Sequence, residues 1–371
     1  MVCMKDIAAA CGVSQGTVSL ALSGDPRVKA ATRARVLEAA ECLGYDPEQN
    51  RAAQRMILRR YGKTTLNTMV ALLCGEYHHA SNYYLLQIQG ILDTLNQAQF
   101  GVMVVARSIA PGATLPPLPA AFPRGEVDGA IIFETDPALV AQLSRTPGFT
   151  DRPMVTTILE HPACSTVTID TELGGYLATR HLLELGHRHF MNFVAADWGL
   201  LFAQRTAGIR RALQEWGLDP DRHTVATPAP FLGDIAPPYH LEMALGYGGH
   251  APHAHVLAQQ RLLLEYLAEH REITALLAHN DPQARRIWYL LQQHGLRVPD
   301  DYSLVGFDDT DAFLDASGVN QLTTVHAPLR EVGQAAAQLL LDRIHNVVVE
   351  NCTITLPTSL AVRGSTTPPG R

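Results

Sequence analysis

The amino-acid sequence predicts an α/β protein with a small helical domain at its N-terminus. Residues 1–47 show short amphipathic helical patterns. From Thr68 onward, apolar strand-like segments alternate with amphipathic helical segments, which is typical of parallel sheets covered by helices. A chain of 371 residues is also long enough to bury a substantial core in more than one domain.

The composition is that of an ordinary globular protein. No apolar run reaches the roughly twenty residues that a membrane-spanning helix needs, and the N-terminal segment lacks the apolar region of a signal peptide. The six cysteines are scattered, which fits neither a disulfide framework nor a metal-binding knuckle. We therefore expect a cytoplasmic protein with reduced thiols, and we expect neither a metal nor a cofactor.

Charge is distributed unevenly along the chain. Residues 1–63 contain ten Lys and Arg against six Asp and Glu, a balance of +4, whereas the whole chain carries −7. The remainder therefore carries −7 − 4 = −11. A basic end on an acidic body suits a protein that offers only that end to phosphates, although counts this small also allow chance asymmetry.

The segment Lys5–Ser23 predicts two short helices with a turn at Gly12 between them. Gly12 tolerates a left-handed conformation, and Ser14 is a good N-cap for the second helix. That helix is expected to direct four polar side chains outward: Ser14, Gln15, Thr17 and Ser19. The pattern is that of a helix-turn-helix, whose second helix can enter the DNA major groove; a helical hairpin within a larger core is the alternative.

A third helix is predicted from about residue 30 to residue 43, after a turn at Gly24-Asp25-Pro26. Lys29 or Ala30 occupies its N-cap position, so the cap is expected to be weak. Its expected core face consists of four residues: Val36, Leu37, Ala40 and Leu43.

The rest of the chain predicts the strands and helices of the α/β core. The expected strands are 69–74, 101–106, 127–133, 153–158, 189–195, one ending at Asn280, 303–309 and 321–325. The expected helices include 83–99, 137–143 and 328–344. The helix 83–99 is expected to bury Leu85, Ile88, Leu92 and Leu95. The tail after Arg363 is expected to be disordered.

Residues 5–47 resemble the N-terminal domain of the lactose-repressor (LacI/GalR) family of bacterial transcription regulators. The matching residues are Asp6, Ile7, Ala8, Gly12-Val13-Ser14, Thr17-Val18-Ser19, Val28, Thr32-Arg33, Val36, Gly44-Tyr45 and Pro47. The resemblance returns at residues 168–188 and 273–313. It implies a headpiece of three helices, a hinge helix, and a core of two subdomains, similar to periplasmic binding proteins, that dimerises.

The resemblance implies three domains. These are a headpiece (1–47), a hinge helix with linker (48–63) and an effector-binding core (64–371). Within the core, subdomain one is expected to comprise 64–165 plus 310–325. Subdomain two is expected to comprise 166–309 plus 326–363.

The resemblance also implies which residues contact DNA. The candidates are Ser14, Gln15, Gly16, Thr17, Ser19, Leu20 and Ser23 for the bases, Lys29 and Arg33 for phosphates, and Asn50, Arg51, Ala53 and Met56 in the hinge helix. Leu20 stands where the family often has an arginine that can bind guanine, so it offers only apolar contacts. The hinge helix would enter the minor groove and wedge Met56 or Ile57 between base steps.

Five residues are candidates for effector binding: Tyr83, Glu134, Arg205, Asp281 and Asp308. The aspartates follow strands, where ligands bind in open α/β folds. The family's arginine at Arg205 grips ligand oxygens, and its aspartate at Asp281 accepts bonds from sugar hydroxyls. A structural salt bridge is the alternative for Arg205, and a structural turn is preferred for Asp309.

Residues 223–262 are rich in Pro, Gly, His and aromatic residues, and their role is open. A metal site built from His250, His253 and His255 is disfavoured, because they lie in a Gly- and Pro-rich loop without cysteines. A loop that places Tyr239 or Tyr247 at the effector is the preferred interpretation.

These observations together predict a DNA-binding transcription regulator, more specifically a repressor. Its expected partners are a palindromic double-stranded operator, a second copy of the chain and a small-molecule effector, most simply a sugar. A sensor that activates transcription, or that needs a corepressor, is the alternative. An enzyme is not expected, since the chain has no G-x-S-x-G, no Gly-rich phosphate loop and no metal-binding helix.

Overall fold

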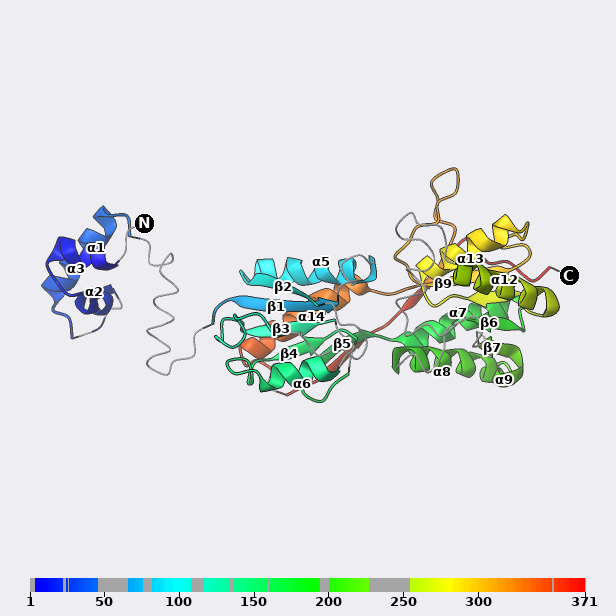
Figure 1. The fold of residues 1–371 in the computed structure, drawn as a ribbon, viewed down its shortest axis with the longest axis horizontal. Coiled ribbons are helices and arrows are strands. Elements are labelled where there is room, and N and C mark those ends of the chain that lie inside the picture. The colour runs from blue at the N-terminus through cyan, green and yellow to red at the C-terminus, as the bar shows by residue number, and fades with distance from the viewer. Residues whose placement is uncertain are drawn as a thin grey trace. The chain divides into compact units, whose positions relative to one another are not determined.

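The computed structural model describes residues 4–22, 25, 27–45, 66–75, 82–107, 117–133, 137–158, 160–193, 200–226, 254–348 and 350–370. The chain divides into two compact units, Met1–Asn67 and Thr68–Arg371 (Figure 1). The expected hinge helix, 48–63, lies outside the described residues.

The first unit contains three short helices, α1 (Met4–Cys11), α2 (Gln15–Leu22) and α3 (Ala30–Cys42). Gly12 has a φ of 61° and forms the turn between α1 and α2. The Ser14 hydroxyl accepts a hydrogen bond from the Thr17 amide at 3.1 Å, which confirms the predicted N-cap. Lys29 caps α3 without a side-chain hydrogen bond, as expected.

The expected core face of α3 is only half right. Val36 and Ala40 are buried, but Leu37 is 48% exposed and Leu43 is 39% exposed. The other two helices of the headpiece cover only a narrow stripe of α3. Val36 and Ala40, four residues apart, lie on that stripe. Leu37 lies about 100° around the helix from Val36 and remains at the surface.

The second unit contains two sheets, each with six strands. The first sheet is parallel, in the order β11-β5-β4-β3-β1-β2. Its strands are β1 (Met69–Gly75), β2 (Gly101–Arg107), β3 (Gly129–Ile132), β4 (Met154–Thr156), β5 (Ser165–Ile169) and β11 (Thr353–Leu356). Helices α5 (Asn82–Gln97) and α14 (Leu329–Ile344) cover one face of this sheet, and α6 (Pro137–Arg145) covers the other (Figure 1).

The second sheet has the order β12-β10-β9-β8-β6-β7, and only β12 runs antiparallel to its neighbour. Its strands are β6 (Phe190–Asn192), β7 (Thr224–Ala226), β8 (Ala275–Leu277), β9 (Ser303–Asp308), β10 (Thr323–His326) and β12 (Ser359–Ala361). Helices α7 (Thr171–Leu185) and α8 (Leu200–Glu215) cover one face. Helices α12 (Ala254–Glu269) and α13 (Asp281–Gln293) cover the other, and the short α9 (Pro220–His223) precedes β7.

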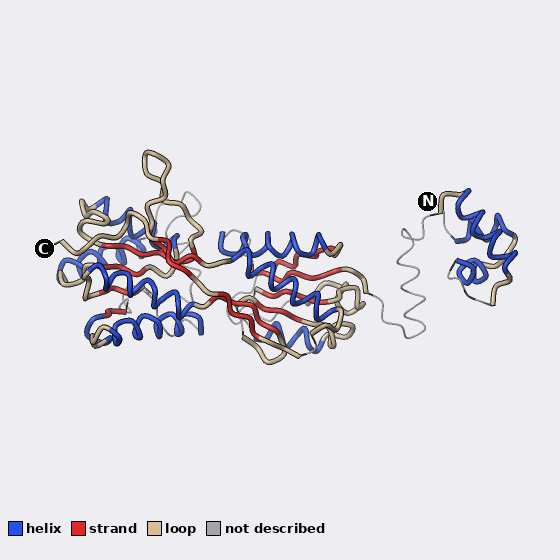
Figure 2. Tube along the Cα trace, turned by 180° about the vertical axis from the view of Figure 1, so that it is seen from behind, coloured by secondary structure: helices blue, strands red, loops and turns tan. Residues whose placement is uncertain are grey.

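Strands are found within or overlapping the expected ranges 69–74, 101–106, 127–133, 153–158, 189–195, 303–309 and 321–325, whereas the strand expected to end at Asn280 ends at Leu277. The expected division of the core is wrong at several elements, β11 among them. Strand β5 belongs to the first sheet, β10 pairs with β9 in the second sheet, and α14 packs on α5. The chain passes between the two sheets after β5, after β10 and again between β11 and β12 (Figure 2). The described residues of the subdomain around the first sheet therefore lie within 68–169 and 329–356, and those of the other lie within 171–326 and 359–370.

The face that α5 buries also differs from the expectation. Gln87, Gly90, Ile91 and Leu95 are buried, whereas Leu85 is 38% exposed. A Cβ on Gly90 would overlap the carbonyl oxygen of Arg330 on α14. Because the backbones of α5 and α14 cross closely at Gly90, the side of α5 that carries Gly90 faces α14. Leu85 lies on another side of α5, away from the core.

The tail after Arg363 is ordered against the second sheet, so the expected disorder is wrong. Ser365 is fully buried, and its hydroxyl accepts from the Thr323 amide at 2.8 Å and donates to the Leu304 carbonyl at 2.6 Å. The Thr367 amide donates to the Ser303 hydroxyl at 3.0 Å. Small hydroxyl side chains thus satisfy backbone groups that a disordered tail would leave to water.

Candidate DNA-binding and effector-binding sites

Helix α2 presents a polar surface at its N-terminal half. Ser14, Gln15 and Gly16 are exposed, and Thr17 and Ser19 are half-buried. Leu20 is half-buried and packs against the headpiece core, so only part of its side chain faces outward. This surface has the polarity that a helix needs to enter a major groove.

The two phosphate candidates of the headpiece differ. Lys29 is exposed at the start of α3. Arg33 is half-buried, and its guanidinium donates to the Asp25 carbonyl at 2.5 Å, so it braces the turn before α3. Five further DNA candidates lie outside the described residues: Ser23, Asn50, Arg51, Ala53 and Met56.

Three effector candidates lie close enough to interact electrostatically. Tyr83 belongs to α5 of the first subdomain, whereas Arg205 on α8 and Asp308 at the end of β9 belong to the second. Burial raises the pKa of the Tyr83 phenol, the charge of Asp308 raises it further, and Arg205 opposes the shift. The charges of Arg205 and Asp308 thus influence Tyr83 across the two subdomains. Glu134 lies outside the described residues.

Arg205 is held mainly by the second subdomain. Burial lowers its pKa to about 10, against the opposing effect of Asp308 and then of Tyr83. Its guanidinium lies 3.4 Å from the centroid of the Phe307 ring, and Nη1 donates to the His279 carbonyl at 2.5 Å. Its Nε is buried without a hydrogen-bond partner.

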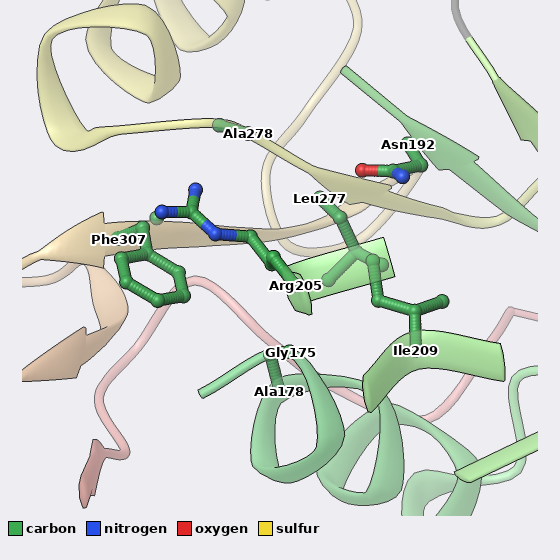
Figure 3. A pocket seen from close by; sticks show the side chains of 9 residues that line it. Gly175, Ala178, Asn192, Arg205, Ile209, Leu277, Ala278 and Phe307 are labelled. Atoms are coloured by element: carbon green, nitrogen blue, oxygen red, sulfur yellow. The ribbon is translucent and has the colours of Figure 1, made fainter. Parts of the chain in front are cut away.

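A small internal cavity lies beside Arg205. Figure 3 shows Arg205 and Phe307 at one side of this cavity and Asn192 at another. All of its lining residues come from the second subdomain: Gly175, Ala178, Asn192, Arg205, Ile209, Leu277, Ala278, Gly306 and Phe307. The cavity therefore shares Arg205 with the group of Tyr83, Arg205 and Asp308, but neither Tyr83 nor Asp308 lines it.

Asp281 occupies a different environment from the one expected. It is fully buried at the start of α13, and both carboxyl oxygens have partners in the protein. Oδ1 contacts the Thr324 hydroxyl at 2.5 Å, and Oδ2 accepts from the amides of Thr310 at 2.7 Å and Asp311 at 3.4 Å. Burial raises the pKa of Asp281 to about 8, although these hydrogen bonds oppose the shift.

The Asp308-Asp309 pair has two separate roles. Asp308 is 8% exposed and has a φ of 95°, which is unusual for a residue other than glycine. Asp309 forms an ion pair with Arg363 at 2.8 Å and also contacts His326. These contacts fit the structural role that the sequence favours for Asp309.

Two residues near the site were missed from the sequence. The amide of Asn82 on α5 donates to the Thr310 carbonyl and to the Asp311 carboxylate, both at 3.2 Å, and so bridges the subdomains. Asn280 accepts from the Gln283 amide at 2.8 Å and caps α13. The Asn280-Asp281-Pro282 sequence signals this cap, but no sequence signal pairs Asn82 with residues more than two hundred positions away.

Among the described residues, no group of three or more His, Cys, Asp or Glu side chains could hold a metal ion. No helix in the same parts of the chain is long and apolar enough to cross a membrane. His250 and His253 lie outside the described residues, and so do Tyr239 and Tyr247.

Comparison with known proteins identifies both units. Residues 3–48 match the family model described as bacterial regulatory proteins, lacI family, and residues 179–366 match that of a periplasmic binding protein-like domain. The regulator CelR of Thermobifida fusca is 28% identical over 98% of this chain and 97% of its own. The repressor PurR of Aliivibrio salmonicida is 28% identical over 93% of this chain and 92% of its own.

Solved structures show the same fold. A complex of CelR with cellobiose has a TM-score of 0.61 at 24% identity and covers 98% of this chain and all of its own. A lac repressor dimer bound to operator has a TM-score of 0.64 at 23% identity and covers 99% of each chain. With its helix-turn-helix headpiece and its core of two subdomains, this chain belongs to the lacI family of bacterial regulatory proteins.

Proposed function

We propose that this chain is a transcriptional repressor that binds a palindromic operator in the cytoplasm and is not an enzyme. The observation that carries the proposal is the exposed polar N-terminal half of α2, on a headpiece that matches the lacI model over residues 3–48. Gln15 and Ser14 would contact base edges, while Lys29 would contact phosphate. Gly16 has no side chain and would allow a close approach of the helix backbone.

The effector is a sugar that binds where Tyr83, Arg205 and Asp308 meet. A carboxylate and a planar arginine are suited to several hydroxyl groups at once, and the Tyr83 ring offers both a hydroxyl and an apolar face. The similar CelR binds cellobiose. Because Tyr83 comes from one subdomain and the other two residues come from the second, a sugar held by all three would favour one relative position of the subdomains.

The chain works as a homodimer, through an apolar strip on the first subdomain. β2 is an edge strand of its sheet, and Val104 on it is 61% exposed. Val105 packs in the cluster that contains α6, so the neighbouring Val104 points to the opposite face, where α5 presents Leu85. A strand edge that no other described strand pairs with, next to exposed apolar side chains, is suited to pairing with a second copy.

The first test is to select fragments of the source genome with the purified chain and to footprint the selected sites at a fixed salt concentration. We expect one enriched palindrome, since two headpieces read two half-sites. A variant lacking residues 1–63 should lose this selection but still bind a sugar. Specific operator binding by the truncated variant would refute the assignment of DNA binding to the headpiece.

If the full chain selects no sequence alone but does so with a sugar present, the effector is a corepressor and not an inducer. Titration calorimetry with cellobiose, D-ribose and other common mono- and disaccharides identifies the effector. A chain that selects a palindrome but binds no sugar in this panel would refute the sugar and leave the repressor in place.

A further inference from the structure

The side chain of Asn82 joins the two subdomains of the core outside the segments where the chain crosses between them. Asn82 is the first residue of α5 in the first subdomain. Its Nδ2 donates to the Thr310 carbonyl and to Oδ1 of Asp311, both at 3.2 Å, and these two residues follow β9 in the second subdomain. Other contacts between the subdomains, such as the hydrogen bond from the Thr358 hydroxyl to the Asp170 carbonyl, lie within the crossing segments.

The acceptor side of this contact is fixed within the second subdomain. Nη2 of Arg285, on α13, lies 3.7 Å from Oδ1 of Asp311 and donates to the Ala312 carbonyl at 3.1 Å. The Arg285 guanidinium also lies 5.2 Å from the centroid of the Phe313 ring. Because α13 holds residues 311–313 in this way, the acceptors of Asn82 move together with the second subdomain.

The Asp311 carboxylate has little contact with solvent and few donors. Its side chain is 9% exposed, and its Oδ2 is buried without a hydrogen-bond partner in the part of the chain that the structure describes. The bond from Asn82 to Oδ1 has a charged acceptor, which makes it stronger than a bond between neutral groups. The first turn of α5 adds a favourable field for the negative charge. Moving the subdomains apart at this point therefore costs free energy.

We propose that Asn82 is a latch between the subdomains, which holds residues 310–311 against the start of α5 and stabilises the observed arrangement of the core before any effector binds. The latch itself is a contact within the chain. Its effect on effector affinity rests on the site proposed above, because only a sugar held by both subdomains would bind this arrangement more tightly.

The contact predicts an effect that depends on both side chains together. Asn82→Asp places a carboxylate opposite that of Asp311, and neither group has a proton to donate, so the two repel each other. When Asp311→Asn is added, the new amide can donate to the new carboxylate, and the bond forms in the reverse direction. The double variant should therefore regain a contact that Asn82→Asp alone has lost.

A role for Asn82 within its own helix predicts the opposite result. A negative side chain in the first turn of a helix is favourable, so Asn82→Asp would then stabilise α5. Residues 309–313 belong to the other subdomain and would not respond. The exposed position of Asn82 makes the substitution compatible with folding in either case.

The test measures hydrogen exchange in the full chain without effector, in the peptides that cover residues 82–90 and 309–313. The variants are Asn82→Ala, Asn82→Asp, Asp311→Asn and the double variant Asn82→Asp, Asp311→Asn. The matched control is Asn96→Asp, which makes the same substitution at an exposed residue in the last turn of α5.

We expect Asn82→Asp to speed exchange at 309–313 by about tenfold, and Asn82→Ala to speed it by about threefold, since loss of one bond to a charged group is smaller than its replacement by repulsion. In the background of Asp311→Asn, the same Asn82→Asp substitution should change exchange by less than about twofold, because the reversed bond replaces the repulsion. Asn96→Asp should leave exchange at 309–313 unchanged.

Two results would overturn the latch. In one, Asn82→Asp changes exchange at 309–313 by the same factor with Asp311 and with Asp311→Asn, so the two side chains do not interact. In the other, Asn82→Asp changes exchange only at 82–90, so the side chain acts within α5 alone.

Titration calorimetry with cellobiose and D-ribose separates the latch from the proposed effector site. For a sugar that binds, we expect Asn82→Asp to weaken the affinity by up to about tenfold and the double variant to regain it, because apparent affinity scales with the population of the binding arrangement. If the exchange results hold but the affinity does not change, the latch stands and a sugar held by both subdomains is refuted. If neither sugar binds, the choice of sugar fails, and the exchange results alone decide the latch.

Discussion

At the scale of single residues, two buried carboxyl groups that follow strands of the second sheet have different surroundings. Asp281 follows β8 and Asp308 ends β9, and their sequence contexts look equally suited to a ligand. Both oxygens of Asp281 have hydrogen-bond partners in the protein, whereas the charge of Asp308 influences Tyr83 and Arg205. The partners of Asp281 include Thr310 and Thr324, which are distant in the sequence.

The raised pKa of Asp281 predicts a pH-dependent stability. A carboxyl group whose pKa rises on folding, here from 3.8 to about 8, stabilises the fold most fully below 3.8, and that contribution is lost as pH rises toward 8. Between about pH 5 and pH 8, the thermal midpoint of the wild type should therefore fall relative to that of Asp281→Asn, which cannot ionise. The free energy of unfolding should fall by at most about 1.4 kcal/mol per pH unit in this range.

The matching control is Asp315→Asn. Hydrogen bonds from the Ser317 hydroxyl and the Val319 amide lower the pKa of Asp315, so its contribution is lost only as pH falls below that range. Over the same pH interval its midpoint should run parallel to that of the wild type. If the midpoint of Asp281→Asn also runs parallel to that of the wild type, the buried carboxyl group of Asp281 does not titrate in this pH range.

At the scale of elements, the sequence predicts strands better than it predicts helix faces. Strands β1, β2 and β3 are apolar runs, which is typical of parallel strands buried on both faces. Strands β5, β7, β11 and β12 were not expected, because they contain Ser or Thr and because β11 lies exposed at a sheet edge. The face of α5 was misassigned because Gly90, and not the leucines, makes the closest contact with α14.

The crossing of α5 and α14 predicts a large effect from one methyl group. A Cβ on Gly333 would overlap the carbonyl oxygen of Gln87, a backbone atom that cannot move alone. We expect Gly333→Ala to lower the free energy of unfolding in urea by about 1–3 kcal/mol, despite the better helix propensity of alanine.

Gln338→Ala, at an exposed position of the same helix, serves as the control and should change stability by less than about 0.5 kcal/mol. If Gly333→Ala is as stable as the control, the two backbones do not approach as closely as the structure shows.

At the scale of the whole molecule, the family and the headpiece could be predicted from the sequence, but the division of the core could not. The pattern around Gly12 and Ser14 is local, so a short stretch specifies it. The placement of α14 depends on its packing against α5, which is far from it in the chain, and that of β10 depends on its pairing with β9 in the second sheet. Periodicity does not report such pairings.

The proposed dimer is tested at the same scale. We expect the double variant Leu85→Glu, Val104→Lys to dimerise at least tenfold more weakly, at roughly 1.4 kcal/mol per tenfold, and to bind the operator correspondingly less well. Analytical ultracentrifugation measures the dissociation, and the control is Ile354→Lys on β11, at the opposite edge of the same sheet. Dissociation caused by the control and not by the double variant would place the interface at β11.

Because the chain crosses between the two sheets three times, neither sheet is complete when the first strands of the other have been synthesised. Strand β11 completes the first sheet and β12 completes the second, and both lie within residues 353–361, after all the other described strands. A nascent chain on the ribosome therefore holds two unfinished sheets until residues 353–361 have been added. The headpiece needs no such partner, so it can fold early, and an unfinished core leaves its strand edges, not its DNA-binding helices, exposed to aggregation.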